Sequence, residues 1–83
     1  MLNVSAASQP AVKVLELNGF REKQRITAQD VQASPPQLHA GTIVSVWSDR
    51  TATVQWDYDL PFAVERRLVN AGHVELHNLT RHS

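Results

Sequence analysis

The side chains with the clearest chemical potential in this sequence are basic and aromatic groups suited to binding. Arg21, Lys23 and Arg25 alternate along a short segment, and Arg66 and Arg67 stand next to each other further on. Arginine and large aromatic side chains are among the types most enriched in binding hot spots. We therefore predict a partner-binding set of basic and aromatic residues. Its members are Phe20, Arg21, Lys23, Arg25, Trp47, Tyr58, Phe62, Arg66 and Arg67.

The basic residues have two further interpretations. A solvated polar face is the ordinary one, because Glu22, Asp30 and Glu65 lie near enough to neutralise part of the charge. A nucleic-acid surface is the alternative, because phosphate contacts depend on local patches as well as on net charge. Eight Lys and Arg balance eight Asp and Glu, so the chain lacks the global basic excess of a typical non-specific nucleic-acid binder.

The sequence offers little for catalysis or metal binding. It contains no cysteine and no Gly-x-Ser-x-Gly elbow, and its three glycines are too widely separated to form a phosphate-binding loop. Asp57 and Asp59 share a strand face if the strand continues that far, but acid–base catalysis needs a perturbed pKa in a cleft, so a solvated strand end is the preferred interpretation. His73 and His77 are four residues apart, yet a metal site needs a third fixed ligand and a second shell. We predict no catalytic residue, no cofactor and no metal.

Length and composition indicate one small domain. A chain of 83 residues buries only roughly 60–65% of its extended-chain surface, so its core is thin and self-association is a plausible source of extra buried area. The absence of cysteine favours a reducing, cytoplasmic setting. No apolar run approaches the ~20 residues that span a bilayer, and the N-terminus lacks the pattern of a signal peptide. We therefore predict a cytoplasmic protein without membrane contact or a small-molecule substrate.

The elements that must position these side chains are short β-strands. Residues 42–47 (TIVSVW) and 51–56 (TATVQW) are β-branched runs joined by turn residues, and the second run alternates apolar and polar side chains. Asn18 and Gly19 are the strongest short-range hairpin signal, because a type I′ turn needs φ > 0 at both positions. Further strands are expected over residues 11–17, 20–26, 63–69 and 74–76.

Loops and tails separate these strands. Residues 27–31 fit either a helical turn or a continued strand, residues 33–40 with two prolines fit a loop, and residues 70–73 fit a turn or a 3₁₀ turn. No amphipathic helix is predicted. The sum is an all-β fold over residues 11–77, a small barrel of five or six short antiparallel strands with one 3₁₀ turn before the last strand. A flexible N-terminal tail is expected at residues 1–10, and a C-terminal tail at residues 78–83. The expected core residues are Ile43, Val46, Val54, Trp56, Leu68, Val74 and Leu76, with Val14 or Leu15.

Three segments together resemble the SH3-like small-barrel superfamily. They are residues 41–46 (GTIVSV), residues 54–57 (VQWD) and residues 72–76 (GHVEL). The layout is similar to Tudor and KOW modules, to the small stromal subunit of photosystem I and to the variable subunit of ferredoxin–thioredoxin reductase. The resemblance covers residues 11–77, whereas the first hairpin and the two-proline loop fit no single family.

The resemblance implies several expectations about function. In Tudor-like barrels, aromatic residues near these strand ends form a cage for a methylated cation, held by cation–π attraction. Here that cage would draw on Trp47, Trp56, Tyr58 and Phe62; the alternative is that Trp56 is core and Trp47 packs across the barrel end. A remote alternative is a subunit of an oligomeric enzyme resembling type II dihydrofolate reductase, to which the Val-Gln-Trp run is only superficially similar and from which no catalytic residue is carried over.

The sequence therefore predicts a non-catalytic binding or accessory module that acts through protein–protein contacts. The alternative is nucleic-acid binding of the KOW or Tudor kind. The first hairpin, residues 12–26, is expected to lie at an interface with a protein partner or a second copy, since its Asn-Gly turn keeps it preformed. Phe20 would be the anchor of that interface, and Glu16, Arg21 and Glu22 would form its polar rim.

Overall fold

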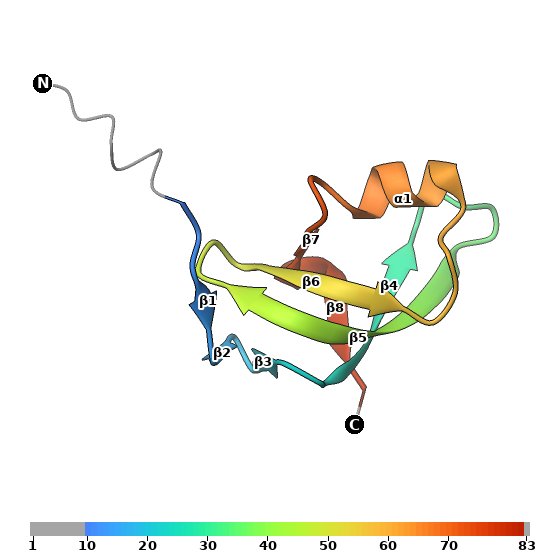
Figure 1. Cartoon of the computed structure of the whole chain (residues 1–83). Helices are drawn as coiled ribbons and strands as arrows, with labels where there is room; N and C mark the ends of the chain where they lie inside the picture. Colours follow the sequence, from blue (N-terminus) through green and yellow to red (C-terminus); the bar gives the residue numbers. More distant parts are fainter. Residues whose placement is uncertain (1–9, 83) are drawn as a thin grey trace, which may run out of the picture.

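The computed structural model describes residues 10–82, which form a small all-β, barrel-like fold. A strongly curled antiparallel sheet forms a half-barrel, and one short helix lies across it (Figure 1). The main sheet contains the strands β1 (Lys13–Val14), β4 (Arg25–Asp30), β5 (Gln37–Trp47), β6 (Thr51–Trp56), β7 (Val74–Glu75) and β8 (Leu79–Arg81). Their order across the sheet is β7-β6-β5-β4-β8, with β1 paired to β5. The predicted N-terminal tail lies, apart from Pro10, outside the described residues. Within the described part of the chain, no helix has the length and apolar character needed to cross a membrane.

The centre of the sheet is the predicted hairpin. Strand β5 (Gln37–Trp47) pairs with β6 (Thr51–Trp56), from Gly41 opposite Trp56 to Trp47 opposite Thr51. Strand β5 begins five residues earlier than expected, so the expected loop over residues 33–40 is wrong from Gln37 onward. The register shifts between Ile43 and Ser45, which marks a β-bulge.

The first hairpin is confirmed at its turn and corrected in its length. Asn18 and Gly19 both have positive φ, 55° and 86°, as a type I′ turn requires. The strands on either side, β2 (Glu16–Leu17) and β3 (Phe20–Arg21), are only two residues long. Strand β1 (Lys13–Val14) pairs with β5 instead of extending the hairpin. Lys23 has φ 69°, which breaks the expected returning strand, and a new strand, β4 (Arg25–Asp30), continues through the segment that the sequence left open.

The segment expected as a strand over residues 63–69 is a helix, α1 (Phe62–Leu68). Its buried residues, Val64 and Leu68, are four apart, and that spacing fits both a strand of period 2 and a helix of period 3.6. Arg66 distinguishes the two, because a strand would place it on the buried face and a helix places it outside. Glu and Arg between the apolar residues are also good helix formers.

The C-terminal segment closes the sheet. Strand β7 (Val74–Glu75) pairs with β6, a 3₁₀ turn η2 (Leu76–Asn78) follows, and β8 (Leu79–Arg81) pairs with β4. The 3₁₀ turn before the last strand is therefore confirmed. The expected C-terminal tail is wrong over residues 79–81, because Leu79 is buried against the core and its strand forms one edge of the sheet; Ser83 lies outside the described residues.

The core fills the space between the curled sheet and α1. Ile43, Val46, Leu68, Val74 and Leu76 are buried as predicted, whereas Val54, Trp56 and Val14 are half-buried at its margin. Leu15 is 93% exposed. The core residues that the prediction omitted are Phe20, Ile26, Ala28, Ala52, Val64 and Leu79.

Candidate partner-binding site

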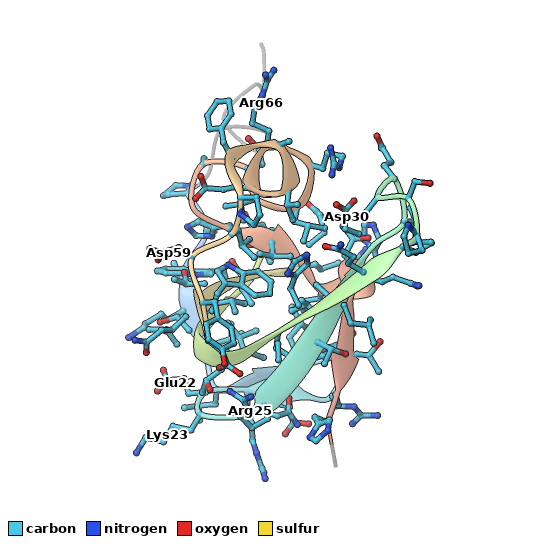
Figure 2. The ribbon with its side chains drawn as sticks, turned by 90° about the vertical axis from the view of Figure 1, so that its right-hand side faces the viewer. Glu22, Lys23, Arg25, Asp30, Asp59 and Arg66 are labelled. Carbon is cyan, nitrogen blue, oxygen red and sulfur yellow. The ribbon has the colours of Figure 1, made fainter. Side chains whose placement is uncertain are left out.

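A hollow lies between the end of β6 and α1. Its volume is about 420 Å³, and the chain lines it from the last residues of β6, the following segment and the helix. The chain leaves the sheet after Trp56, runs through a segment that includes Tyr58 and Asp59, and enters α1 at Phe62 (Figure 2). The lining residues are Gln55, Trp56, Tyr58, Asp59, Leu60 and Glu65.

The hollow combines aromatic rings with unpaired carboxylates. Tyr58 is 85% exposed, and Trp56 is half-buried beside it. Asp59 and Glu65 take part in none of the ion pairs found among residues 10–82. Carboxylates attract a cation by charge, and the faces of Trp and Tyr attract it through the ring quadrupole. The arrangement is therefore suited to a cationic group.

An ion pair holds the end of β6 in place. Arg25 Nη1 donates to Asp57 Oδ1 at 2.7 Å, and Nη2 donates to Oδ2 at 2.6 Å. Asp57 N also donates to Ala40 O at 3.0 Å, which extends the ladder one residue past β6. The hydrogen bonds from Arg25 hold the pKa of Asp57 below its ordinary value. Asp57 is thus an ionised structural group, and its pKa is shifted away from the raised value that a general acid needs at neutral pH.

A second ion pair fixes α1 against the sheet. Arg67 Nε donates to Asp30 Oδ1 at 2.9 Å, and Arg67 Nη2 donates to the other carboxylate oxygen. Asp30 is only 2% exposed, and the backbone N–H of Gln32 also donates to it. The hydrogen bonds from Arg67 are the main reason that the pKa of Asp30 lies below its ordinary value. This pair joins the C-terminal half of α1 to the end of β4. It therefore fixes the position of the helix, which lines one side of the hollow.

Several predicted binding residues turn out to be structural. Phe20 is buried at 8% exposure, with the Arg81 guanidinium over its ring, so it is part of the core and its expected role as an exposed anchor is wrong. Arg25 and Arg67 are held by Asp57 and Asp30. Burial and charge pairing come from long-range contacts, which the local sequence does not reveal.

The predicted four-aromatic cluster is divided between separate places. Trp56 and Tyr58 line the hollow, whereas Trp47 lies at the opposite end of the β5–β6 hairpin. Trp47 Nε1 donates to Thr53 Oγ1 at 2.9 Å, and its ring centroid lies 5.2 Å from that of His73. Phe62 is exposed at the start of α1 and is not among the lining residues; the Arg66 guanidinium lies 5.6 Å from the centroid of its ring. A cage of all four rings is therefore wrong.

The remaining basic residues gather at two ends of the molecule. Figure 2 shows Lys23 and Arg25 with Glu22 at one end and Arg66 at the other. Arg21 belongs to the first end through β3, and so does Arg81, whose guanidinium lies over the Phe20 ring and which is not in the predicted binding set. Arg21, Lys23 and Arg81 appear in none of the ion pairs of the described residues. The basic surface is thus smaller than the sequence suggests.

The histidines do not assemble a metal site. His73 Nδ1 lies 3.1 Å from Thr51 Oγ1, and that hydroxyl donates to Asp49 Oδ1 at 2.6 Å. Within residues 10–82 no group of three or more His, Asp or Glu side chains is arranged to hold a metal ion. The His73–Thr51–Asp49 chain therefore stabilises the turn between β5 and β6 against the segment that leads into β7.

Two residues of the hollow are absent from the predicted binding set. The sequence suggests Asp59 only as a partner of Asp57 and Glu65 only as a charge that neutralises nearby basic residues. The position of Glu65 depends on the helix: if residues 62–68 are helical, Glu65 lies at the side of the buried face formed by Val64 and Leu68, and it is exposed there. Comparisons of the chain with models of protein families, with curated proteins and with solved structures found no match.

Proposed function

We propose that this protein is a non-catalytic binding module that accepts a basic side chain of a protein partner in the hollow between β6 and α1. The observation that carries the proposal is the lining of that hollow. Asp59 and Glu65 line the hollow together with Trp56 and Tyr58, and no ion pair within residues 10–82 uses either carboxylate. A lysine or arginine of the partner supplies the missing positive charge and an apolar stem that packs on the rings.

The expected affinity from this hollow alone is modest. An exposed ion pair contributes about 0.2–1 kcal/mol, and a cation–π contact at an exposed site contributes about 0.5–1 kcal/mol. The sum is well short of the roughly 8 kcal/mol that a micromolar complex requires. The basic side chain therefore serves as a specificity contact, and the rest of the affinity comes from other parts of the partner.

A peptide array tests the proposal. Three pools of heptapeptides share random flanking positions and differ at the centre, which is lysine, norleucine or glutamate. We expect the lysine pool to bind best and the glutamate pool worst, and the preference to weaken with salt. Equal binding of the three pools at millimolar peptide concentration, or a preference for the glutamate pool, would contradict the proposal.

Matched variants locate the effect on the protein. The double variant Asp59→Asn/Glu65→Gln removes two carboxylates from the hollow, and Glu16→Gln/Glu22→Gln removes two from the first hairpin, so the net charge changes equally. Only the first pair is expected to abolish the preference for lysine. Tyr58→Ala has Phe62→Ala as its control, because Phe62 is also exposed and does not line the hollow.

The resemblance to SH3-like barrels supports a binding role only by analogy, since fold alone does not specify function. The proposal places the module in the cytoplasm, because a chain without cysteine suits a reducing compartment. Cell fractionation would check that placement, and recovery with an extracellular fraction would contradict it.

Nucleic-acid binding is the second candidate function. The observation in its favour is the group of Arg21, Lys23 and Arg81, cations outside any ion pair of the described residues. Lys13 and Arg25 belong to the same end, but Glu22 and Asp57 partner them. Such a surface makes few phosphate contacts, so binding would be weak and strongly salt-dependent.

A further inference from the structure

The outer edge of β6 is only partly paired. On one side β6 pairs with β5 along its whole length, but on the other side β7 covers only Thr51 and Ala52. Strand β7 is two residues long because the chain before it makes a tight turn, in which Asn70 and His73 exchange backbone hydrogen bonds of 2.8 and 3.0 Å. The second half of β6 is therefore a sheet edge.

The hydrogen-bond pattern shows which backbone groups face outward. Asp57 N donates to Ala40 O, so the backbone groups of Asp57 face β5, and by alternation those of Gln55 do too. The backbone N–H and C=O groups of Val54 and Trp56 then face away from β5. The ladder with β7 agrees, because Ala52 lies opposite Val74 on that outer side. Among the described residues, no hydrogen bond reaches the outward groups of Val54 or Trp56.

This edge lacks the features that usually prevent strand addition. Charged residues, prolines and bulges commonly protect exposed edges, yet residues 53–56 (TVQW) contain no charge and no proline, and the bulge of the hairpin lies on β5. The other edge of the sheet, β8, is three residues long and ends in Arg81 followed by His82. The edge at β6 therefore differs from the edge at β8. Of these two, only the edge at β6 offers unpaired backbone groups on a strand segment without charged residues.

The open edge leads directly into the hollow. Gln55 and Trp56 belong to the edge and also line the hollow, which Asp59 and Glu65 make acidic. A strand added along the edge would place one of its alternate side chains at the hollow. The surface therefore offers backbone pairing and a charge-selective contact side by side, which is the arrangement by which strand-addition sites obtain affinity and specificity.

We propose that an extended, basic segment of a partner protein adds to the sheet as a strand beside Val54 and Trp56, with its lysine or arginine in the hollow. The choice of that side chain rests on the proposed function; the pairing of the edge does not. Charge complementarity with Asp59 and Glu65 favours a basic partner over a second copy of this chain, whose own β6 carries no cation.

Amide hydrogen exchange of the free protein, followed by NMR, tests the edge without any partner. The amides of Val54 and Trp56 are expected to exchange at least about tenfold faster than those of Thr53 and Gln55 on the same strand, because only the latter are hydrogen-bonded. Equal protection of all four amides would overturn the proposal. Slow exchange at Val54 together with dimerisation in sedimentation would show that a second copy occupies the edge, which also overturns it.

The probe for binding is the peptide acetyl-Thr-Val-Thr-Lys-Thr-Val-Thr-amide at millimolar concentration. Its binding is expected to slow exchange at Val54 and Trp56. Two analogues carry N-methyl groups on alternate residues, one on the odd positions and one on the even positions. A paired strand presents alternate N–H groups to its neighbour, so one analogue should lose about tenfold or more in affinity while the other binds nearly as well. Equal affinity of both analogues, or no protection of the two amides by the unmodified peptide, would overturn the proposal.

A norleucine analogue tests strand addition at the edge independently of the proposed binding of a basic side chain in the hollow. If norleucine in place of lysine leaves the affinity unchanged while N-methylation still distinguishes the two analogues, strand addition stands and the cation-binding role of the hollow fails. If lysine is preferred but N-methylation has no effect, the hollow works as proposed and strand addition is refuted. Strand addition and cation binding in the hollow can therefore be refuted independently, each by a different peptide analogue.

Discussion

Replacing Phe20 with alanine distinguishes a core role from an interface role for the first hairpin. In the fold, the Phe20 ring is buried against the core, and the Arg81 guanidinium lies 6.0 Å from its centroid. Leu15 belongs to the same arm and is 93% exposed. The pair offers a matched comparison, since both changes remove an apolar side chain from the arm and only one of them removes buried area.

The size of the effect follows from burial. Truncating a buried phenylalanine to alanine costs about 3–5 kcal/mol through reduced burial and a residual cavity. Phe20 lies in a hairpin with strands of two residues, which should collapse partly around the gap, so we expect a value near the lower limit, about 3 kcal/mol. A domain of 83 residues has a total stability of roughly 4–12 kcal/mol. The variant is therefore expected to lose a large part of its stability.

Urea unfolding followed by tryptophan fluorescence, with linear extrapolation to water, measures this loss. The melting temperature should also fall by at least about 12 °C for a domain of this size. Leu15→Ala should stay within about 0.5 kcal/mol of the parent, as surface substitutions do. If the two variants are equally stable, the Phe20 ring is not buried and the arm does not pack against the core.

Three further predictions concern the sheet, an ion pair and the alternative partner. Gly41→Ala should cost about 1–3 kcal/mol in urea unfolding, because its Cβ would lie 2.7 Å from Gln55 O on the facing strand; an unchanged midpoint would contradict this close approach. Asp30 has a lowered pKa in the folded state, so its stabilising effect is complete above the ordinary carboxyl pKa near 3.8 and is lost as the pH falls through the folded value. Asp30→Asn should therefore flatten the acid side of a plot of urea midpoint against pH, and parallel curves for parent and variant would argue against the pair with Arg67. If nucleic acid binds, replacing Lys23 with glutamine should reduce the slope of log affinity against log salt by about 0.9 for each duplex phosphate that the variant no longer neutralises, whereas no binding at low salt removes that function.

Acid stability should reflect two carboxylates together. Asp57 also has a lowered pKa through its hydrogen bonds with Arg25, so the Asp30→Asn variant should keep part of the pH dependence. The contribution of Asp57 is likewise complete above its ordinary pKa and is lost as the pH falls through its lowered folded-state pKa. The double variant with Asp57→Asn is the control, and its midpoint should be the least sensitive to acid.

Residue patterns within short segments predicted the central hairpin and the turn of the first hairpin correctly, because both depend mainly on neighbouring residues. β-Branched alternation identified both strands of the central hairpin, and Asn18 with Gly19 specified a turn whose positive φ values few other residue pairs tolerate. Five of the predicted core residues are buried, because large aliphatic side chains are among the types that most often lie inside a folded protein.

The sequence was ambiguous where one spacing fits two structures. Val64 and Leu68 satisfy both a strand and a helix, and their burial against the sheet, together with the pairing of Arg67 and Asp30, favours the helix. Leu79 looked like part of a polar tail, yet pairing with β4 makes it a core residue. In both cases a contact with a distant segment decides the outcome, and local propensity carries no information about such contacts.

Local residue patterns account for the central hairpin, for the preformed turn in the first arm and for the predominance of strands. Long-range packing selects which charged and aromatic side chains remain exposed and unpaired among the described residues. It buried Phe20, paired Arg25 and Arg67 with carboxylates, and brought Glu65 of α1 to the end of β6 beside Tyr58. It also left half of an uncharged strand without a neighbour. The physical reason is that side-chain type is a local property, whereas burial, charge pairing and strand pairing depend on segments far apart in the chain.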